Sequence, residues 1–363
     1  MKSKFGISKN VDFAKAVTEA LGGVSNPIGL VYICPYEMIE SVGNELTSRF
    51  PGVPVLGTGG ICYYNDTIDD KHLQIMAVTG GAKMAAGVIK HIKKAPLSEI
   101  YTLEKSVQEV GAGTDNTICL EFCPYNEEVA TSTLNVVLDK HKISLIGGSI
   151  FDVPDGKDPI VYVNGKIYKD TLGYMMIKNT EGKVHMFKEN IYAPSDNPVH
   201  IATKVDLNKR ELCCLDGRPA AQVYSEETGV PVNKVCDNVF VNPFGRVVGD
   251  EVYIASMKEP GTNGGLINYK KIYENDAISI LNVLDYREVV EETKRNIRSK
   301  VSNPSCMISF NCCFRYLFFN SENYTTEYLK NMATVAPNFG YIAGGEQYLN
   351  QHVNQTMVCA VFD

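Results

Sequence analysis

The chain has 363 residues, of which 44% are hydrophobic and 21% charged, and its formal net charge is -7. One hydrophobic core usually stops growing at about 250–300 residues, so we expect two domains. The acidic balance argues against nucleic-acid binding, and the N-terminal residues lack the apolar run of a signal peptide. No stretch reaches the about 20 apolar residues of a membrane span, so we expect no membrane partner.

The first part of the chain alternates helices and strands. Residues 11–21 predict an amphipathic helix that ends at a glycine pair. An apolar strand at 27–33 leads into Cys34-Pro35-Tyr36, a helix to residue 50, and a strand that opens into Gly57-Thr58-Gly59-Gly60. Residues 72–78 and 84–90 are predicted as two strands of a hairpin, because glycines separate them.

The next segments repeat the opening pattern and then change to antiparallel strands. A strand at 117–122 is followed by Cys123-Pro124-Tyr125, a helix, and a strand that ends in Gly147-Gly148-Ser149. An Asn-Gly turn predicts a hairpin over 161–168, and a second hairpin is expected over 172–187. The polar joint at 195–198 is our predicted domain boundary, which gives domains 1–195 and 196–363.

The second half contains the pattern a third time. It opens with strands at 200–205 and 211–215 and a short helix at 220–228. Residues 305–310 predict a buried strand, followed after a loop by a helix at 324–336 and a strand at 340–343. We interpret the stretches 28–60, 117–148 and 305–345 as related units whose strand ends converge on one cleft.

Charged and thiol side chains lie near the ends of two strands in the third unit. The Arg315 guanidinium can bind a carboxylate through two hydrogen bonds, and Glu346 can accept from an amine. We predict a ligand-binding pocket lined by residues in or just after two of the units, namely Cys313, Arg315, Glu346, Tyr348, Thr58, Gly59 and Cys62. The alternative is that Arg315 and Glu346 form a structural ion pair with each other.

The eleven cysteines allow a second kind of chemistry. An odd number of cysteines in strand-like segments favours reduced, partly buried thiols, and the absence of C-x-x-C argues against a structural metal site. Cys312 and Cys313 lie near Arg315, which leaves a cysteine-dependent enzyme as an alternative to ligand binding. The glycines at 57–60 match no phosphate-binding motif, so we interpret them as a tight turn.

Four stretches of the chain resemble the FIST sensory domain (F-box and intracellular signal transduction). They are PVLGTGG at 54–60, IGGSIFD at 146–152, LDGRPA at 215–220, and ISFNCCFR at 308–315 with the later GGE at 344–346 and NQT at 354–356. Their order and spacing resemble the N-terminal and C-terminal parts of that family across nearly the whole chain.

The resemblance implies a cytoplasmic sensor of small molecules such as amino acids. Many relatives are fused to a signalling domain, but two sensory parts fill this sequence, so we expect a separate partner such as a kinase or chemoreceptor. Some relatives are proposed to bind haem and sense nitric oxide, which is a further alternative here; otherwise we expect no cofactor. We expect a mixed α/β fold of two related halves, with central β-sheets and outer helices.

Overall fold

The computed structural model describes residues 1–363 and divides them into two compact units. The first unit comprises Met1–Glu189, Val290–His352 and Thr356–Asp363, and the second comprises Asn190–Val289 and Val353–Gln355. The second unit is therefore an insertion into the chain of the first. The predicted boundary at residue 195 lies inside the second unit, close to the point where the chain enters it.

Three six-stranded mixed sheets form the first unit. The first sheet has the order β1 (Lys2–Ser8), β6 (Leu73–Gly80), β2 (Gly29–Cys34), β3 (Val55–Gly59), β10 (Ile160–Val163) and β11 (Lys166–Lys169). The second has the order β26 (Gln351–Val353), β25 (Glu346–Tyr348), β9 (Ser144–Ser149), β8 (Thr117–Cys123), β12 (Thr171–Asn179) and β7 (Ala82–Lys90). The third has the order β13 (Val184–Asn190), β27 (Thr356–Phe362), β23 (Cys306–Cys312), β24 (Asn338–Ala343), β4 (Cys62–Tyr64) and β5 (Thr67–Asp69).

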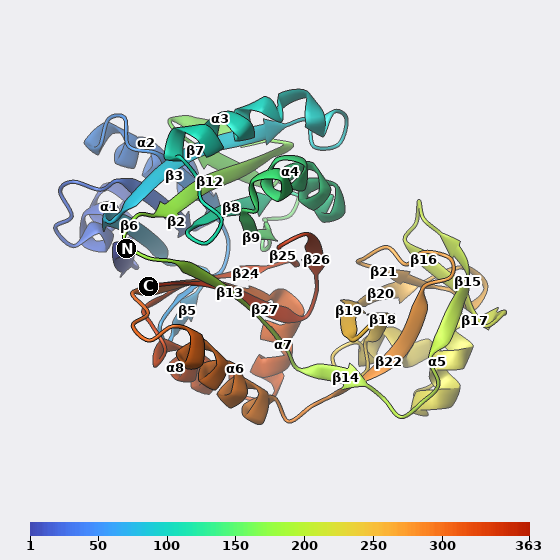
Figure 1. Ribbon diagram of the computed structural model, residues 1–363. Helices are drawn as coiled ribbons and strands as arrows, with labels where there is room; N and C mark the ends of the chain where they lie inside the picture. The colour runs from blue at the N-terminus through green and yellow to red at the C-terminus, as the bar shows by residue number, and fades with distance from the viewer. The chain divides into compact units, whose positions relative to one another are not determined.

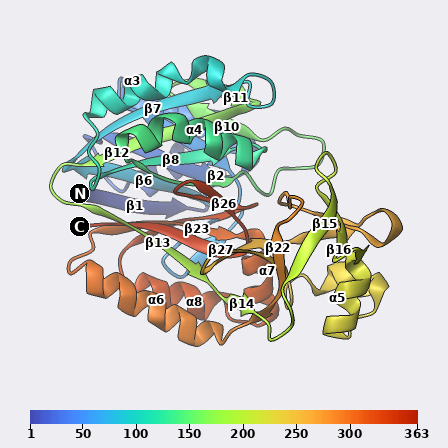
Figure 2. The same ribbon diagram turned by 45° about the vertical axis from the view of Figure 1, so that its right-hand side comes forward.

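Helices cover the outer faces of these sheets, as the sequence predicted. Figures 1 and 2 show α3 and α4 along the second sheet, and α6 and α8 along the third. The first helix begins where the Asp12 side chain accepts hydrogen bonds from two backbone N–H groups, and it ends at Gly22 in a left-handed conformation. The helices of this unit are α1 (Phe13–Leu21), α2 (Ile39–Arg49), α3 (Tyr101–Val110), α4 (Glu127–His141), α6 (Tyr286–Lys300), α7 (Cys313–Ser321) and α8 (Thr325–Ala333).

The three predicted units are present as parallel strand pairs with a helical connection. The pairs are β2 with β3, β8 with β9, and β23 with β24. In each pair, the cysteine that ends the first strand lies opposite a small residue of the second: Cys34 opposite Gly59, Cys123 opposite Ser149, and Cys312 opposite Ala343. The repeated pattern in the sequence therefore corresponds to one repeated structural unit.

Two predicted hairpins are wrong, although their strands exist. Strand β6 pairs with β1 and β2, whereas β7 pairs with β12 in the second sheet. Strand β12 lies between β7 and β8, whereas β13 belongs to the third sheet. Both β6 and β12 are buried on both faces over most of their length, as is typical of strands in the interior of a sheet. Such strands are hydrogen-bonded along both edges, and here the paired strands come from distant segments. The hairpin of β10 and β11 is confirmed.

The predicted loop after Arg315 is also wrong, because α7 begins directly at Cys313. This helix has only nine residues and would be marginal by itself. The Phe319 ring lies 5.0 Å from the Tyr324 ring and 5.2 Å from the Tyr328 ring, between centroids. Aromatic packing against the following helix therefore stabilises α7, and the local sequence does not display that packing.

The second unit contains a nine-stranded sheet and the helix α5 (Ala220–Thr228). Its main path is β19 (Glu251–Ala255), β18 (Phe244–Val248), β22 (Ala277–Val283), β15 (His200–Asp206), β16 (Glu211–Leu215), β21 (Leu266–Asn268) and β20 (Met257–Pro260). Two short strands complete it: β14 (Tyr192–Pro194) pairs with β22, and β17 (Arg218–Pro219) pairs with β16. The predicted strand pair at 200–215 is thus confirmed.

Candidate functional site

The ends of the three parallel strand pairs meet in the first unit. The Tyr341 hydroxyl donates to the Gly59 carbonyl oxygen at 3.0 Å and accepts from the Phe151 N–H at 3.1 Å. The backbone N–H of Gly344 donates to the carbonyl oxygen of Ser149 at 3.0 Å. Each of the three repeated units thus contributes one turn to this point. Open α/β sheets usually carry their ligands where strands end in this way.

Three of the predicted site residues, Thr58, Gly59 and Cys62, are buried next to this meeting point of the strand ends. Thr58 is fully buried and donates to the Ile160 carbonyl oxygen at 2.9 Å, and a Cβ on Gly59 would lie 2.9 Å from the Ile39 side chain. Cys62 is buried, and burial is the largest cause that raises the pKa of its thiol to about 12. These groups therefore hold the chain in place at this point.

Arg315 is fully buried and is bound by a carboxylate of the protein itself. One terminal nitrogen of its guanidinium donates to Glu189, and both side chains are 0% exposed. The guanidinium carbon lies 4.6 Å from the Phe319 ring centroid and 5.2 Å from that of Tyr328. Glu189 is the last residue of the first unit before the chain enters the second. Arg315 therefore holds the end of that segment.

Glu346 is a second buried ionisable side chain that binds a residue next to a unit boundary in the chain. Its Oε2 accepts from the Thr356 hydroxyl at 2.7 Å and from the Thr356 N–H at 3.4 Å. Thr356 is the first residue of the first unit after the short segment Val353–Gln355, which belongs to the second unit. Burial, with a smaller contribution from Cys312, holds the pKa of the Glu346 carboxyl well above its usual range. The interpretation that Arg315 and Glu346 pair with each other is therefore wrong, since each holds another partner.

The other predicted site residues differ in their access to solvent. Cys312 and Cys313 are 2% and 6% exposed, and Tyr348 is half-buried on β25. No group of three or more His, Cys, Asp and Glu side chains is arranged to hold a metal ion. Three expectations stay predictions: the reactivity of the paired cysteines, haem binding, and the direct contact with a ligand of all seven predicted site residues, namely Cys313, Arg315, Glu346, Tyr348, Thr58, Gly59 and Cys62.

Sequence analysis did not identify a buried acidic group in the second sheet. Glu121 lies opposite Gly147, which lies opposite Gln347 on the next strand. The Glu121 Oε1 lies 2.3 Å from the place of a Cβ on Gly147, and both its carboxylate oxygens are buried without a hydrogen-bond partner. Gln347 Oε1 also lacks one. Burial, with Glu127 as a smaller cause, raises the pKa of Glu121 well above its usual range. A single glutamate within the apolar run TICLEFC was the available signal.

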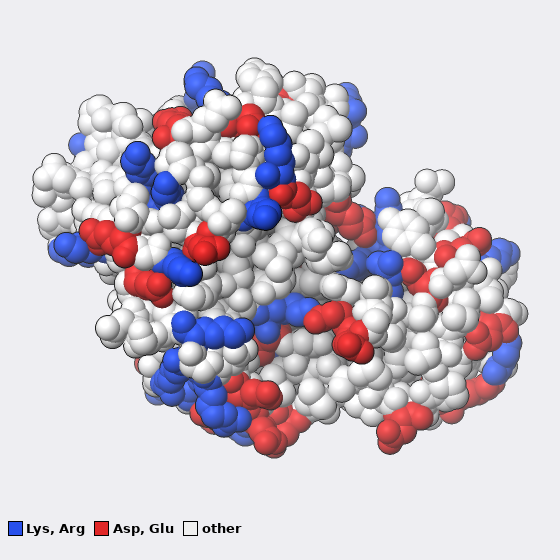
Figure 3. Space-filling view, viewed as in Figure 1, with Lys and Arg blue, Asp and Glu red and all other residues white.

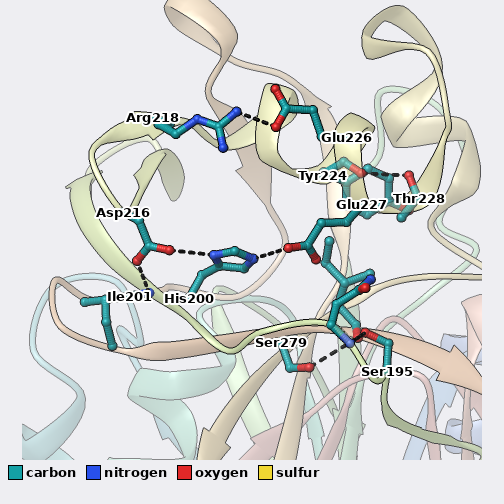
Figure 4. A network of polar contacts seen from close by, with 12 residues as sticks. Ser195, His200, Ile201, Asp216, Arg218, Tyr224, Glu226, Glu227, Thr228 and Ser279 are labelled. Atoms are coloured by element: carbon teal, nitrogen blue, oxygen red, sulfur yellow. Dashed lines mark hydrogen bonds and ion pairs between the residues drawn. The ribbon is translucent and has the colours of Figure 1, made fainter.

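The second unit carries its own network of charges around His200 (Figure 4). Its Nδ1 lies 2.6 Å from Asp216 Oδ2, and its Nε2 lies 2.5 Å from Glu227 Oε1. The Asp216 Oδ1 also accepts from the Ile201 N–H at 2.8 Å. Burial opposes protonation of His200, but the two carboxylates outweigh it and raise the pKa of the imidazole. The network therefore ties β15 to the turn after β16 and to α5.

We expect this network to make stability depend on pH. Because the pKa of His200 is raised above its ordinary 6.5, its contribution is complete below pH 6.5 and is lost as the pH rises through the raised value. Because the Ile201 backbone N–H and the His200 imidazole lower the pKa of Asp216, its contribution to stability is lost only in acid, below its ordinary 3.8. In His200→Gln, urea unfolding should show a smaller fall between pH 6 and 9 than in the wild type. An unchanged fall would contradict this assignment.

The face of the molecule drawn in Figure 3 gives no support for a nucleic-acid partner. On the face drawn in Figure 3, basic and acidic side chains lie in small mixed groups, and neither sign covers a large area. Proteins that bind nucleic acids usually present a continuous basic patch. No helix of the structure has the length and apolar character needed to cross a membrane.

Comparison with known protein families accounts for most of the chain. The FIST N domain matches residues 27–218, and the FIST C domain matches residues 220–349. Both are sensory domains of signal transduction that are thought to bind small ligands. The chain belongs to the FIST family and contains both of its parts, as the resemblance of its motifs predicted. A search of curated proteins found no match.

Proposed function

We propose that this protein binds a small carboxylate, such as an amino acid, in the cytoplasm and regulates a separate signalling partner such as a kinase or chemoreceptor. Its membership in a family of sensory domains supports the class of function. The buried pair of Arg315 and Glu189 supports the class of ligand, because it is a guanidinium that already holds a carboxylate away from water.

In this proposal, the ligand carboxylate takes the place of Glu189 on Arg315. Glu189 binds with one oxygen only, since its Oε2 is buried without a hydrogen-bond partner. A planar guanidinium is better matched by a carboxylate that uses both oxygens. Because Glu189 ends the first segment of the first unit, the exchange would release the chain at that point. Such a release is a change that a partner protein can detect.

Removal of the internal carboxylate tests this proposal. Glu189→Ala leaves the buried Arg315 without its counter-charge, which usually costs about 3–5 kcal/mol of stability. We expect acetate, organic acids or amino acids to fill the vacated space and to raise the melting temperature of this variant in a concentration-dependent way. The measurement is a thermal-shift screen of wild type and variant against the same set of acids and amino acids.

A matched variant separates binding from a general salt effect. Glu189→Gln keeps the volume of the side chain, so no space opens for a carboxylate and no rescue is expected. Chloride at equal ionic strength should also fail to rescue Glu189→Ala. The proposal is wrong if no acid or amino acid stabilises the wild type or Glu189→Ala, or if Arg315→Met leaves the response unchanged.

A further inference from the structure

The second unit contains an open cleft of about 840 Å³ that the sequence did not indicate. Its volume lies within the about 300–1,000 Å³ that is usual for small-molecule sites. Strands β15 and β16 and their turn form one wall, and the short helical turn Thr262–Gly264 and the loop at 273–274 form the others. All lining residues belong to the second unit. This cleft is separate from Arg315.

Each wall of the cleft is fixed by the protein's own hydrogen bonds. The buried Glu211 accepts from the Thr262 N–H at 2.5 Å and thereby holds the glycine-rich loop at 261–265. Asp276 accepts from the Tyr273 N–H at 2.8 Å and from Arg246 Nε at 2.8 Å. These contacts keep the walls in place before a ligand arrives, which lowers the entropy cost of binding.

Two charges in the cleft are not used by these contacts. Glu211 is bound to the loop, and Asp206 accepts from two backbone N–H groups of its turn and lies 3.9 Å from Lys209 Nζ. Lys204 and Glu274 are exposed, and neither has an ion-pair or hydrogen-bond partner in the protein. One ammonium and one carboxylate therefore remain, which complement a ligand with one charge of each sign.

The cleft also contains apolar surface. Leu207 and Tyr273 are 42% and 44% exposed, and both line it together with Val205. Exposed apolar groups around a few convergent charges are typical of ligand sites. The volume exceeds what a single free amino acid fills, whereas a short peptide has apolar side chains, a carboxylate and an ammonium group.

We propose that this cleft binds a short zwitterionic peptide of about two to four residues. The ammonium of Lys204 binds the peptide's C-terminal carboxylate, and the Glu274 carboxylate binds its N-terminal ammonium. Leu207 and Tyr273 contact the apolar side chains. This site does not depend on the exchange at Arg315, because it lies wholly within the second unit.

Three partly exposed cysteines allow a direct test in the full-length protein. Cys213 and Cys214 line the cleft, whereas Cys236 does not. We would measure iodoacetamide labelling of each thiol by peptide mass mapping, with and without an equimolar mixture of tripeptides. Labelling of Cys213 and Cys214 should slow about tenfold at about ten times the Kd, while labelling of Cys236 stays constant.

Variants and blocked peptides identify the groups that bind. Lys204→Met and Glu274→Gln should each weaken protection about fivefold, as judged by the ratio of rates with and without peptide. Lys234→Met, outside the cleft, should leave that ratio unchanged. The ratio of rates is used because Lys204 also affects the reactivity of the Cys213 thiol directly. Burial raises the pKa of this thiol, and the charge of Lys204 lowers it. Equal protection by N-acetylated, C-amidated peptides, stronger protection by free amino acids, or no protection by any tripeptide would overturn the proposal.

Discussion

Replacement of Arg315 by methionine is expected to lower the free energy of unfolding by about 3–5 kcal/mol. Both Arg315 and Glu189 are 0% exposed, so the variant leaves Glu189 as a buried charge without its counter-ion. The loss also removes the contact of the guanidinium with the rings of Phe319 and Tyr328. Urea unfolding at neutral pH, monitored by circular dichroism, measures the difference.

A double variant separates the ion pair from the packing. Arg315→Met with Glu189→Leu removes both charges and keeps apolar volume, so it should recover most of the lost stability. The coupling energy from the four-protein cycle gives the strength of the interaction. A single variant that lies within about 1 kcal/mol of the wild type would show that the Glu189 carboxylate finds another partner or water.

The same pair illustrates what local sequence can predict. Strand, thiol, helix and glycine turn are signals within about 30 residues, and all three repeated units were found from them. Arg315 lies in α7, and the residue that binds it lies 126 positions away on β13 of the third sheet. No local pattern links two such residues, so the sequence indicated a cation near a strand end but not its burial or its partner.

For a similar reason, local patterns could not predict that β6 and β7 join different sheets. Strands β6 and β7 are adjacent in the chain, and the turn between them contains Gly81 at a φ of 66°. A glycine of this kind suits a hairpin turn and a crossover between sheets equally well. The strand edges that decide between them come from β1 and β12, which are distant in the sequence. In the cleft of the second unit, likewise, only the tertiary fold brings the segments at 262–263 and 273–274 next to strands β15 and β16.

Replacement of Glu121 by glutamine is expected to stabilise the protein, most strongly in mildly basic solution. The pKa of Glu121 is raised by burial in the folded state, whereas the unfolded chain ionises near the ordinary 4.5. Between these two pH values, folding must take up a proton, and stability falls by about 1.4 kcal/mol for each pH unit. Glutamine cannot ionise, so Glu121→Gln should lack this part of the fall. Urea unfolding from pH 5 to pH 8.5 measures it.

An exposed glutamate in the same region supplies the control for this prediction. Glu109→Gln changes the same functional group on the solvent side of α3, so its stability should follow the wild type at every pH. Glu346 is also buried with a raised pKa, so Glu121→Gln should reduce the pH dependence without abolishing it. The variant Glu121→Gln/Glu346→Gln should then show the flattest profile of the series. A Glu121→Gln protein that is less stable than the wild type at pH 8.5 would mean that Glu121 is ionised in the folded state and held by a cation.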